Sequence, residues 1–300
     1  MSMMTRIEQA LSQPFMVADS ATAPPRLMAA MRHAVFPGGA RIRPQLCIAV
    51  AKACGEDAPD LTNAAAASIE LLHCASLVHD DMPCFDDADT RRGQTTVHKQ
   101  FGEPLALLTG DALIVLAYQT LARAGARHPH RLARLLMTVC EGTGTPDGIV
   151  AGQAWECEPR VQLGRYQRAK TGALFVASTC AGAQAAGTDP EPWRRLGDAL
   201  GEAYQVADDI RDVMGADQLG KPVGQDAQHG RPSTAADLGL LGAVDYFRKL
   251  IQSAVQSVPA CASREAMQQL VLHESERLLP QSACDQIAVQ HAASQRRAVA

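Results

Sequence analysis

The sequence is poor in aromatic residues and in long hydrophobic runs. Aromatic side chains make up 4% of its 300 residues, with two tryptophans, four tyrosines and six phenylalanines. This composition disfavours a β-rich fold, whereas abundant alanine and leucine favour helices. No run reaches the ~18 consecutive apolar residues expected of a membrane span, and the N-terminal residues lack the apolar core of a signal peptide. We therefore predict a chain without a membrane span that is soluble and cytoplasmic.

Paired cysteines and an excess of basic charge are also missing. Nine cysteines occur without a C-x-x-C pair, which fits the reduced, mostly buried thiols of a cytosolic protein better than a disulfide framework. A net charge of −4 gives no basic footprint for nucleic acid. Strand and helix patterns do not alternate in the way that indicates a parallel sheet. We expect an all-α, single-domain helical bundle over residues 1–300, with 1–24 as an N-terminal segment and 280–300 as a tail with little packing signal.

An acidic motif follows the apolar helical run of residues 64–78. Asp80 and Asp81 are adjacent, and Asp86 lies about one and a half helical turns further on, with the helix expected to be distorted at Pro83. Mg²⁺ is usually held by one or two carboxylates together with substrate phosphates. Arginines follow at positions 91 and 92, and their planar donor forks suit phosphate oxygens. For an isolated pair of aspartates, a solvated acidic loop would be the better interpretation, but a second acidic cluster in the sequence argues against it.

That second motif lies in residues 204–213. Asp208 and Asp212 are four residues apart and share a helix face with Gln205. Because like charges at this spacing weaken an isolated helix, a metal or a cationic partner would explain them. Two such clusters, facing one another across a cavity, can hold one diphosphate through several Mg²⁺ ions. The candidate metal ligands are Asp80, Asp81, Asp86, Asp208, Asp209 and Asp212.

With these motifs and several others, the sequence resembles the trans-type, head-to-tail polyprenyl diphosphate synthases of the short-chain farnesyl and geranylgeranyl group. The resemblance covers roughly residues 35–235 in order and spacing. It rests on Gly38-Gly39-Ala40-Arg41-Ile42-Arg43-Pro44, His73, the stretch from Asp80 to Asp86 with Arg91-Arg92-Gly93, Val97-His98, Gly110-Asp111-Ala112, Gly152-Gln153, Lys170-Thr171-Gly172, Gln205, Asp208-Asp209-Ile210-Arg211-Asp212 and Gly220-Lys221-Pro222-Val223-Gly224-Gln225-Asp226.

The resemblance implies a Mg²⁺-dependent prenyltransferase that condenses isopentenyl diphosphate with allylic diphosphates. It also implies helices around a central cavity, a homodimer, about three Mg²⁺ ions with the bound diphosphate and a lid formed by the loop of residues 215–232. The implied catalytic residues are Asp80, Asp81, Asp86, Lys170, Thr171, Asp208 and Asp209. The implied substrate-binding residues are Arg41, Arg43, His73, Arg91, Arg92, Lys170, Thr171, Gln205 and Lys221.

One residue departs from the family pattern. Ala40 stands where the family has a lysine after the two glycines. The change removes a phosphate contact, which is expected either to raise the Michaelis constant for isopentenyl diphosphate or to be compensated by Arg41.

Product length is expected to depend on the residues below the first acidic motif. Ala75 precedes Asp80 by five residues, which is ~7.5 Å along a helix. Members that stop at the fifteen-carbon farnesyl product commonly carry an aromatic floor at this level, whereas Ala75 and Ser76 leave the tunnel open. We therefore predict geranylgeranyl diphosphate as the main product. The deeper floor is expected from Leu72, Leu113 or Tyr118.

Other functions compete with this one. A farnesyl diphosphate synthase keeps the chemistry and changes only the product. A class I terpene cyclase also uses an aspartate-rich motif, but its second motif normally mixes in serine, threonine and glutamate, and its pocket is usually rich in aromatics. A non-catalytic regulatory subunit is favoured only by Ala40. The form of the first acidic motif, DDMPCFDDADTRRG, together with GKPVGQD at residues 220–226, looks most like the synthases that feed bacterial carotenoid and photosynthetic pigment pathways.

Overall fold

Helices form nearly all of the regular structure in this computed structural model, which describes residues 1–36, 38–160, 162–214 and 233–289. In chain order the α-helices are α1 (Met3–Ala18), α2 (Pro25–Val35), α3 (Ile42–Ala53), α4 (Pro59–Asp80), α5 (Val97–Phe101), α6 (Glu103–Gly125), α7 (Pro129–Thr143), α8 (Ile149–Ala154), α9 (Leu163–Gln167), α10 (Ala173–Ala185), α11 (Glu191–Met214), α13 (Thr234–Ser257) and α14 (Arg264–Leu278). A 3₁₀ turn, η1 (Trp155–Cys157), follows α8, and a π-helical turn, η2 (Arg168–Gly172), joins α9 to α10. The all-α prediction is confirmed.

Proline marks the start of several of these helices. It occupies the first turn of α2, α4, α6 and α7, where its missing N–H costs no helical hydrogen bond and its fixed φ suits the helix. Alanine- and leucine-rich sequences then continue each helix. The chain therefore specifies the helix starts through proline and the helix bodies through propensity.

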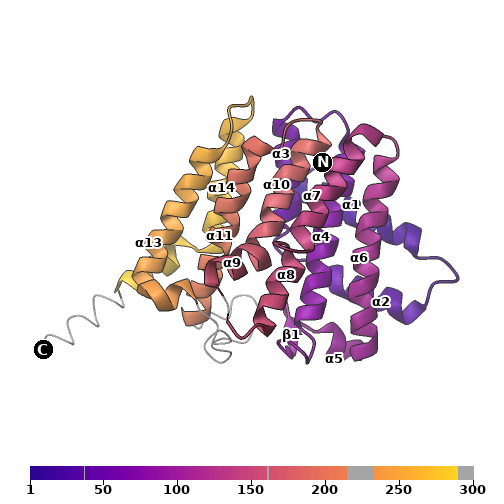
Figure 1. Cartoon of the computed structure of the whole chain (residues 1–300), viewed down its shortest axis with the longest axis horizontal. Helices are drawn as coiled ribbons and strands as arrows, with labels where there is room; N and C mark the ends of the chain where they lie inside the picture. Colours follow the sequence, from indigo (N-terminus) through magenta and orange to yellow (C-terminus); the bar gives the residue numbers. More distant parts are fainter. Residues whose placement is uncertain (37, 161, 215–232, 290–300) are drawn as a thin grey trace, which may run out of the picture.

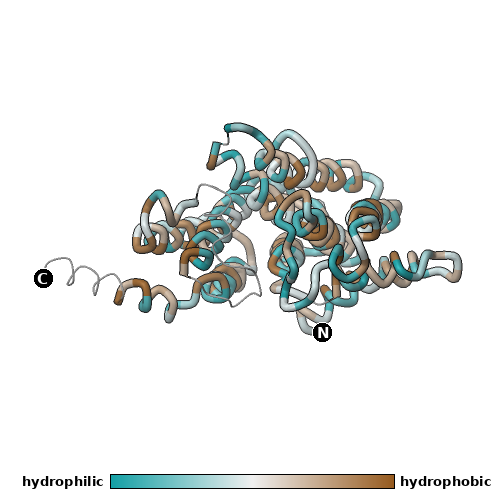
Figure 2. Tube along the Cα trace, turned by 90° about the horizontal axis from the view of Figure 1, so that it is seen from below, coloured by the Kyte–Doolittle hydropathy of each residue, from teal (hydrophilic) through white to brown (hydrophobic). Residues whose placement is uncertain are grey.

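The helices lie side by side in one bundle with α4 inside it (Figure 1). Helix α4 packs against α6, α3 and α10, and most of its residues are buried. One hydrophobic core gathers around α1, α2, α4, α6 and α7, and a second around α3, α10, α11, α13 and α14. Viewed from below, hydrophilic and hydrophobic residues alternate along the helices (Figure 2), as expected of helices with a buried side and a solvent side.

Helices α4 and α6 are each long and apolar enough to cross a membrane by length and composition alone. In α4, 78% of the apolar window is buried within the bundle, so it has the character of a core helix. In α6 only 39% of the window is buried. The outward face of α6 exposes Leu107, Leu108 and Val115, each about half accessible.

Residues near both ends of the chain contribute to the hydrophobic cores. The N-terminal segment is integrated into the fold, because α1 buries Ile7, Leu11 and Phe15 in the first core. The expectation of little packing in residues 280–300 is wrong for its first part: residues 281–289 are helical, and Cys284 and Ile287 are buried in the second core. These two apolar residues are spaced at about one helical turn, so they share the buried face of this short helix.

Candidate active site

The first acidic motif lies where α4 ends. Asp80 is the last residue of α4 and Asp81 is its C-cap, so the helix stops before Pro83 and is not distorted there as expected. The chain turns sharply, and the backbone N–H of Asp86 donates to the carbonyl of Asp80 at 3.0 Å. The proline thus lies in a tight turn, which brings Asp86 back toward the end of the helix.

A short β-hairpin carries the two arginines that follow. Strands β1 (Thr90–Arg91) and β2 (Gln94–Thr95) pair antiparallel. Both residues of the two-residue turn, Arg92 and Gly93, have positive φ, which is the geometry of a type I′ turn. The sequence patterns gave no indication of this hairpin, because arginine is not a typical first residue of such a turn. The hairpin sends consecutive arginines to different places.

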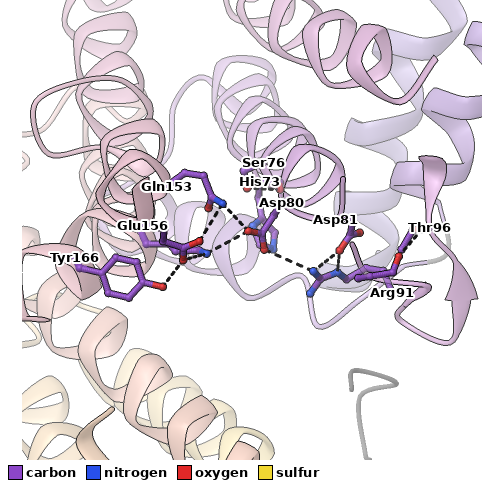
Figure 3. Close-up of polar contacts among 11 residues, drawn as sticks. His73, Ser76, Asp80, Asp81, Arg91, Thr96, Gln153, Glu156 and Tyr166 are labelled. Atoms are coloured by element: carbon purple, nitrogen blue, oxygen red, sulfur yellow. Dashed lines mark hydrogen bonds and ion pairs between the residues drawn. The ribbon is translucent and has the colours of Figure 1, made fainter. Parts of the chain in front are cut away.

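Arg91 contacts the aspartates. Its Nε donates to Asp81 Oδ1 at 2.8 Å, its Nη2 pairs with the same oxygen, and Nη2 lies 3.6 Å from Asp80 Oδ2. Asp80 also accepts from Gln153 Nε2 at 2.8 Å and from Lys170 Nζ at 3.2 Å. Figure 3 shows Asp80 between Arg91 on one side and the Gln153 group on the other. The first motif is therefore flanked by cations on both sides.

The structure adds a carboxylate that the sequence interpretation missed. Oxygens of Asp80, Asp86 and Glu156 all lie within 4.8 Å of one another. Glu156 also accepts from Tyr166 Oη at 2.5 Å and from Lys170 Nζ at 2.5 Å, as Figure 3 illustrates for the tyrosine. The available signal was that Glu156 follows Gln153 by three residues, a spacing that places both on one helix face.

This oxygen cluster fits a hard divalent cation. Mg²⁺ and Ca²⁺ prefer carboxylate oxygens, and three carboxylates within 4.8 Å of one another supply them on one side. Lys170 and Arg91 border the cluster and are suited to phosphate oxygens. The chemistry of the donors thus fits a metal-bridged diphosphate.

Lys170 and Thr171 lie in the π-helical turn η2. π-helical turns are frequent at functional sites. Helix α8 packs closely against this one, because a Cβ on Gly152 would lie 2.2 Å from the backbone nitrogen of Lys170. Only a glycine at that position allows the approach. Lys170 extends to Asp80 and Glu156, whereas the Thr171 hydroxyl donates to Gln205 Oε1 at 2.6 Å. The turn therefore connects the first acidic motif to α11.

The second acidic motif occupies the C-terminal half of α11. Asp208 Oδ1 accepts from Arg211 Nη2 at 3.0 Å, and Asp212 is partly buried. Asp209 differs from both: it is 1% exposed, and its Oδ2 accepts from the backbone N–H of Thr234, at the start of α13. Burial raises the pKa of Asp209 despite these hydrogen bonds. The Asp209 carboxylate thus lies against the start of α13, and its assignment as a metal ligand stays a prediction.

A group of cationic side chains lies next to the first acidic motif, because Arg92 follows Arg91 in the hairpin. Arg43 Nη1 and Arg92 Nη2 lie 3.3 and 3.4 Å from His73 Nε2, and Arg92 Nη1 donates to the carbonyl of Gly38 at 2.7 Å. The guanidinium of Arg43 stacks on Phe175, 4.5 Å from the ring centroid. In the described part of the chain, the buried Arg43 Nε and His73 Nδ1 have no hydrogen-bond partner.

The pKa of His73 is held well below its ordinary value by burial and by the neighbouring Arg43 and Arg92. The imidazole is therefore neutral near pH 7, and its Nε2 can accept from the arginines. Two guanidinium groups gathered on one neutral histidine form a site for an anion. These residues are the ones expected to hold isopentenyl diphosphate, apart from Arg41.

Arg41 is not part of this site. Its side chain is inaccessible and donates to Glu8 at 2.9 Å, to Glu70 at 2.7 Å and to the carbonyl of Val35 at 2.7 Å. Because the guanidinium faces the core, Arg41 cannot compensate for the missing lysine at Ala40. It ties α1, α2 and α4 to the start of α3, immediately before Arg43.

Two other expected features are placed only in part. Lys221 and the rest of the expected lid lie outside the described residues. Ala75, Leu72 and Leu113 are all buried in the first core, and Ser76 Oγ donates to the carbonyl of His73 at 2.8 Å. Burial and the neighbouring Cys140 thiol of α7 raise the pKa of Tyr118 to about 12.

The helical bundle, its two acidic motifs and the adjacent cationic site define a class of enzyme that handles diphosphates. A model of the polyprenyl synthetase family matches residues 24–270, and the chain belongs to this family. It shares 49% identity with a geranylgeranyl diphosphate synthase of Cereibacter sphaeroides over 276 residues, 92% of this chain and 96% of the relative.

Two further proteins are similar to this chain. A farnesyl diphosphate synthase of Geobacillus stearothermophilus is 37% identical over 77% of this chain and 81% of its own length. The crystal structure of a Helicobacter pylori geranyltransferase, complexed with magnesium and isoprenyl diphosphate, superposes with a TM-score of 0.79 at 28% identity, covering 91% of this chain and 95% of that one. The family and the prenyltransferase class predicted from the sequence are confirmed.

Proposed function

We propose that this enzyme condenses isopentenyl diphosphate with allylic diphosphates, depends on Mg²⁺, and makes mainly geranylgeranyl diphosphate. The observation that carries the proposal is the pair of adjacent anion sites joined by the hairpin. Arg91 contacts the aspartates and Arg92 contacts His73. Two consecutive residues would therefore bind two diphosphates close together. Two diphosphates in neighbouring sites are what a head-to-tail condensation requires.

Mg²⁺ fits the carboxylate site, where Asp80, Asp81, Asp86 and Glu156, with Asp208 and Asp212, would hold about three ions. When bound, the metal neutralises charge on the leaving diphosphate. Lys170 and Arg91 add fixed positive charge to the same group. The relative from Helicobacter pylori, which was crystallised with magnesium and isoprenyl diphosphate, supports this assignment.

The remaining steps need no side-chain nucleophile. As the allylic carbon–oxygen bond breaks, the Thr171 oxygen stabilises the cation by its dipole. Arg43, His73 and Arg92 orient isopentenyl diphosphate so that its double bond attacks that cation. The proton then lost from the new chain passes to the departing diphosphate. Catalysis is therefore mainly positioning and charge stabilisation.

The chain-length assignment rests on small residues near the top of α4. Ala75 contributes only a methyl group to the core, and Leu72, close to one turn below it, is buried in the same core as Leu113. We assign the floor to these two leucines, because the Tyr118 hydroxyl is directed at α7. Similarity to geranylgeranyl diphosphate synthases supports the twenty-carbon product.

The physiological setting is also a proposal. We propose a cytoplasmic enzyme, a homodimer formed through the exposed face of α6, and a role in supplying carotenoid or photosynthetic pigment synthesis. The dimer assignment draws support from the apolar residues on α6, and the pathway assignment from the form of the first acidic motif together with the GKPVGQD sequence.

Product analysis tests the function. The purified protein is incubated with Mg²⁺, labelled isopentenyl diphosphate and, separately, dimethylallyl, geranyl and farnesyl diphosphates, and the products are dephosphorylated and chromatographed. We expect geranylgeraniol from every primer. Farnesol alone would keep the enzyme class and refute the chain-length assignment. No condensation with any primer would favour the regulatory-subunit alternative.

A further inference from the structure

Asp209 takes part in a hydrogen-bonded chain that ends at Thr171. The Thr171 hydroxyl lies 2.6 Å from Gln205 Oε1, and Gln205 Nε2 lies 2.8 Å from Asp209 Oδ1. The other carboxylate oxygen of Asp209 accepts from the backbone N–H of Thr234 at 2.7 Å. Both Asp209 and Thr171 are buried. The chain thus runs from a helix terminus to a residue of the π-helical turn beside the first acidic motif.

The chemistry of these groups fixes the direction of every bond in the chain. An ionised carboxylate only accepts hydrogen bonds, so the side-chain NH₂ of Gln205 must face Asp209. The carbonyl oxygen of Gln205 must then face Thr171, and an amide oxygen also only accepts. The Thr171 hydroxyl is therefore obliged to donate its proton to Gln205, which leaves its lone pairs directed elsewhere.

We propose that Asp209 is a positioning residue, which acts through Gln205 to turn the lone pairs of Thr171, rather than its proton, toward the developing allylic cation. This inference rests on the proposed function. An oxygen whose proton is held by Gln205 presents the negative end of its dipole and stabilises positive charge. If the amide of Gln205 were reversed, it would donate to Thr171, whose free proton would then face the cation and destabilise it.

A metal-binding role for Asp209 fits the structure less well. Each of its oxygens already accepts an N–H, from Gln205 and from Thr234, and Gln167 Nε2 lies 3.4 Å from Oδ2. These donors stabilise the buried negative charge of Asp209. The negative charge of the neighbouring Asp208 acts against them and raises the pKa of Asp209. Asp209 is the most deeply buried of the second-motif aspartates. Its carboxylate is thus used within the protein.

The test is the substitution Asp209→Asn, compared with Asp208→Asn as a proposed metal ligand. An asparagine can still accept from Thr234 through its side-chain oxygen, but its NH₂ group then faces Gln205 and can only donate, which favours the reversed amide of Gln205. We expect kcat to fall roughly 10- to 100-fold, with the Mg²⁺ concentration for half-maximal activity unchanged within about twofold. In Asp208→Asn that concentration should rise. A comparable rise in Asp209→Asn would overturn the proposal in favour of a metal ligand.

A double-mutant cycle with Thr171→Val separates positioning from a purely structural role. If Asp209 acts through the Thr171 hydroxyl, Asp209→Asn should lower kcat little further once that hydroxyl is gone. Additive losses would overturn the proposal, as would a lower melting temperature of Asp209→Asn with kcat intact. Failure of the proposed function is recognised separately, because the wild-type enzyme would then form no product.

Discussion

At the residue scale, function depends on what each charged side chain contacts. Arg91 and Arg92 are neighbours in sequence, yet one contacts Asp81 and the other contacts His73 and Gly38. Arg41 and Arg43 are two residues apart, but Arg41 pairs with Glu8 and Glu70 whereas Arg43 contacts His73. In each pair one arginine, Arg41 or Arg92, has a backbone with positive φ.

The two glycines before Ala40 allow a matched test of this site. Gly39 has φ of +143°, and a Cβ there would lie 2.8 Å from Arg92 Cζ, whereas Gly38 at φ +85° has nothing within 4 Å of its Cβ position in the described part of the chain. We predict that Gly39→Ala displaces Arg92 and raises the KM for isopentenyl diphosphate roughly tenfold or more. Steady-state kinetics at saturating farnesyl diphosphate measure this effect.

Gly38→Ala is the control for Gly39→Ala. It should cost about 1 kcal/mol of stability through its left-handed backbone, visible in urea unfolding, and change the KM little. Equal KM values in the two variants would show that the approach of Arg92 to Gly39 does not matter for binding.

At the element scale, α4 combines two tasks in one helix. Its C-terminal end carries Asp80 and Asp81, and its buried middle carries the residues assigned to chain length. Because a helix rises ~1.5 Å per residue, the sequence separation between the acid pair and a bulky side chain sets a length. The rigidity of a buried helix makes that length reproducible.

We therefore predict that Ala75→Phe shortens the main product from twenty to fifteen carbons. The phenyl ring would occupy the space beside Leu113, and overpacking is expected to cost about 1–3 kcal/mol of stability. Leu72→Ala is the reciprocal variant and should allow longer products. Chromatography of the dephosphorylated alcohols, with melting temperatures to verify folding, measures both. Unchanged products in both variants would place the floor elsewhere.

At the scale of the whole molecule, the exposed apolar residues of α6 indicate a binding partner. Leu107, Leu108 and Val115 are spaced at i, i+1 and i+8, so they share one face of a long helix. An apolar helix face of this kind is typical of an interface. We proposed above that a second copy of the chain covers it.

The predicted consequence is that Val115→Glu dissociates the dimer. Light scattering after size exclusion should give twice the 31.9 kDa chain mass for the wild type and the single mass for the variant. Met16→Glu, on the exposed side of α1 at 72% accessibility, is the control and should remain dimeric. A wild-type protein that runs as a monomer would refute the proposal outright.

The sequence by itself determined the helical class, most helix positions and the two acidic motifs. Helix propensity, proline at helix starts and the spacing of carboxylates are local properties, readable without a fold. The resemblance added Arg43, His73, Lys170 and Thr171 as site candidates, and the structure places Arg43 against His73 and Lys170 against Asp80.

Only the tertiary structure decided what each polar group contacts. It added Glu156 to the carboxylate cluster of Asp80 and Asp86, placed Arg41 in a buried ion pair and showed that Asp209 accepts from the start of α13. These partners lie 25 residues or more apart in the chain. Local spacing cannot indicate such contacts, because they form only when separate helices pack and buried charges must find hydrogen-bonding partners.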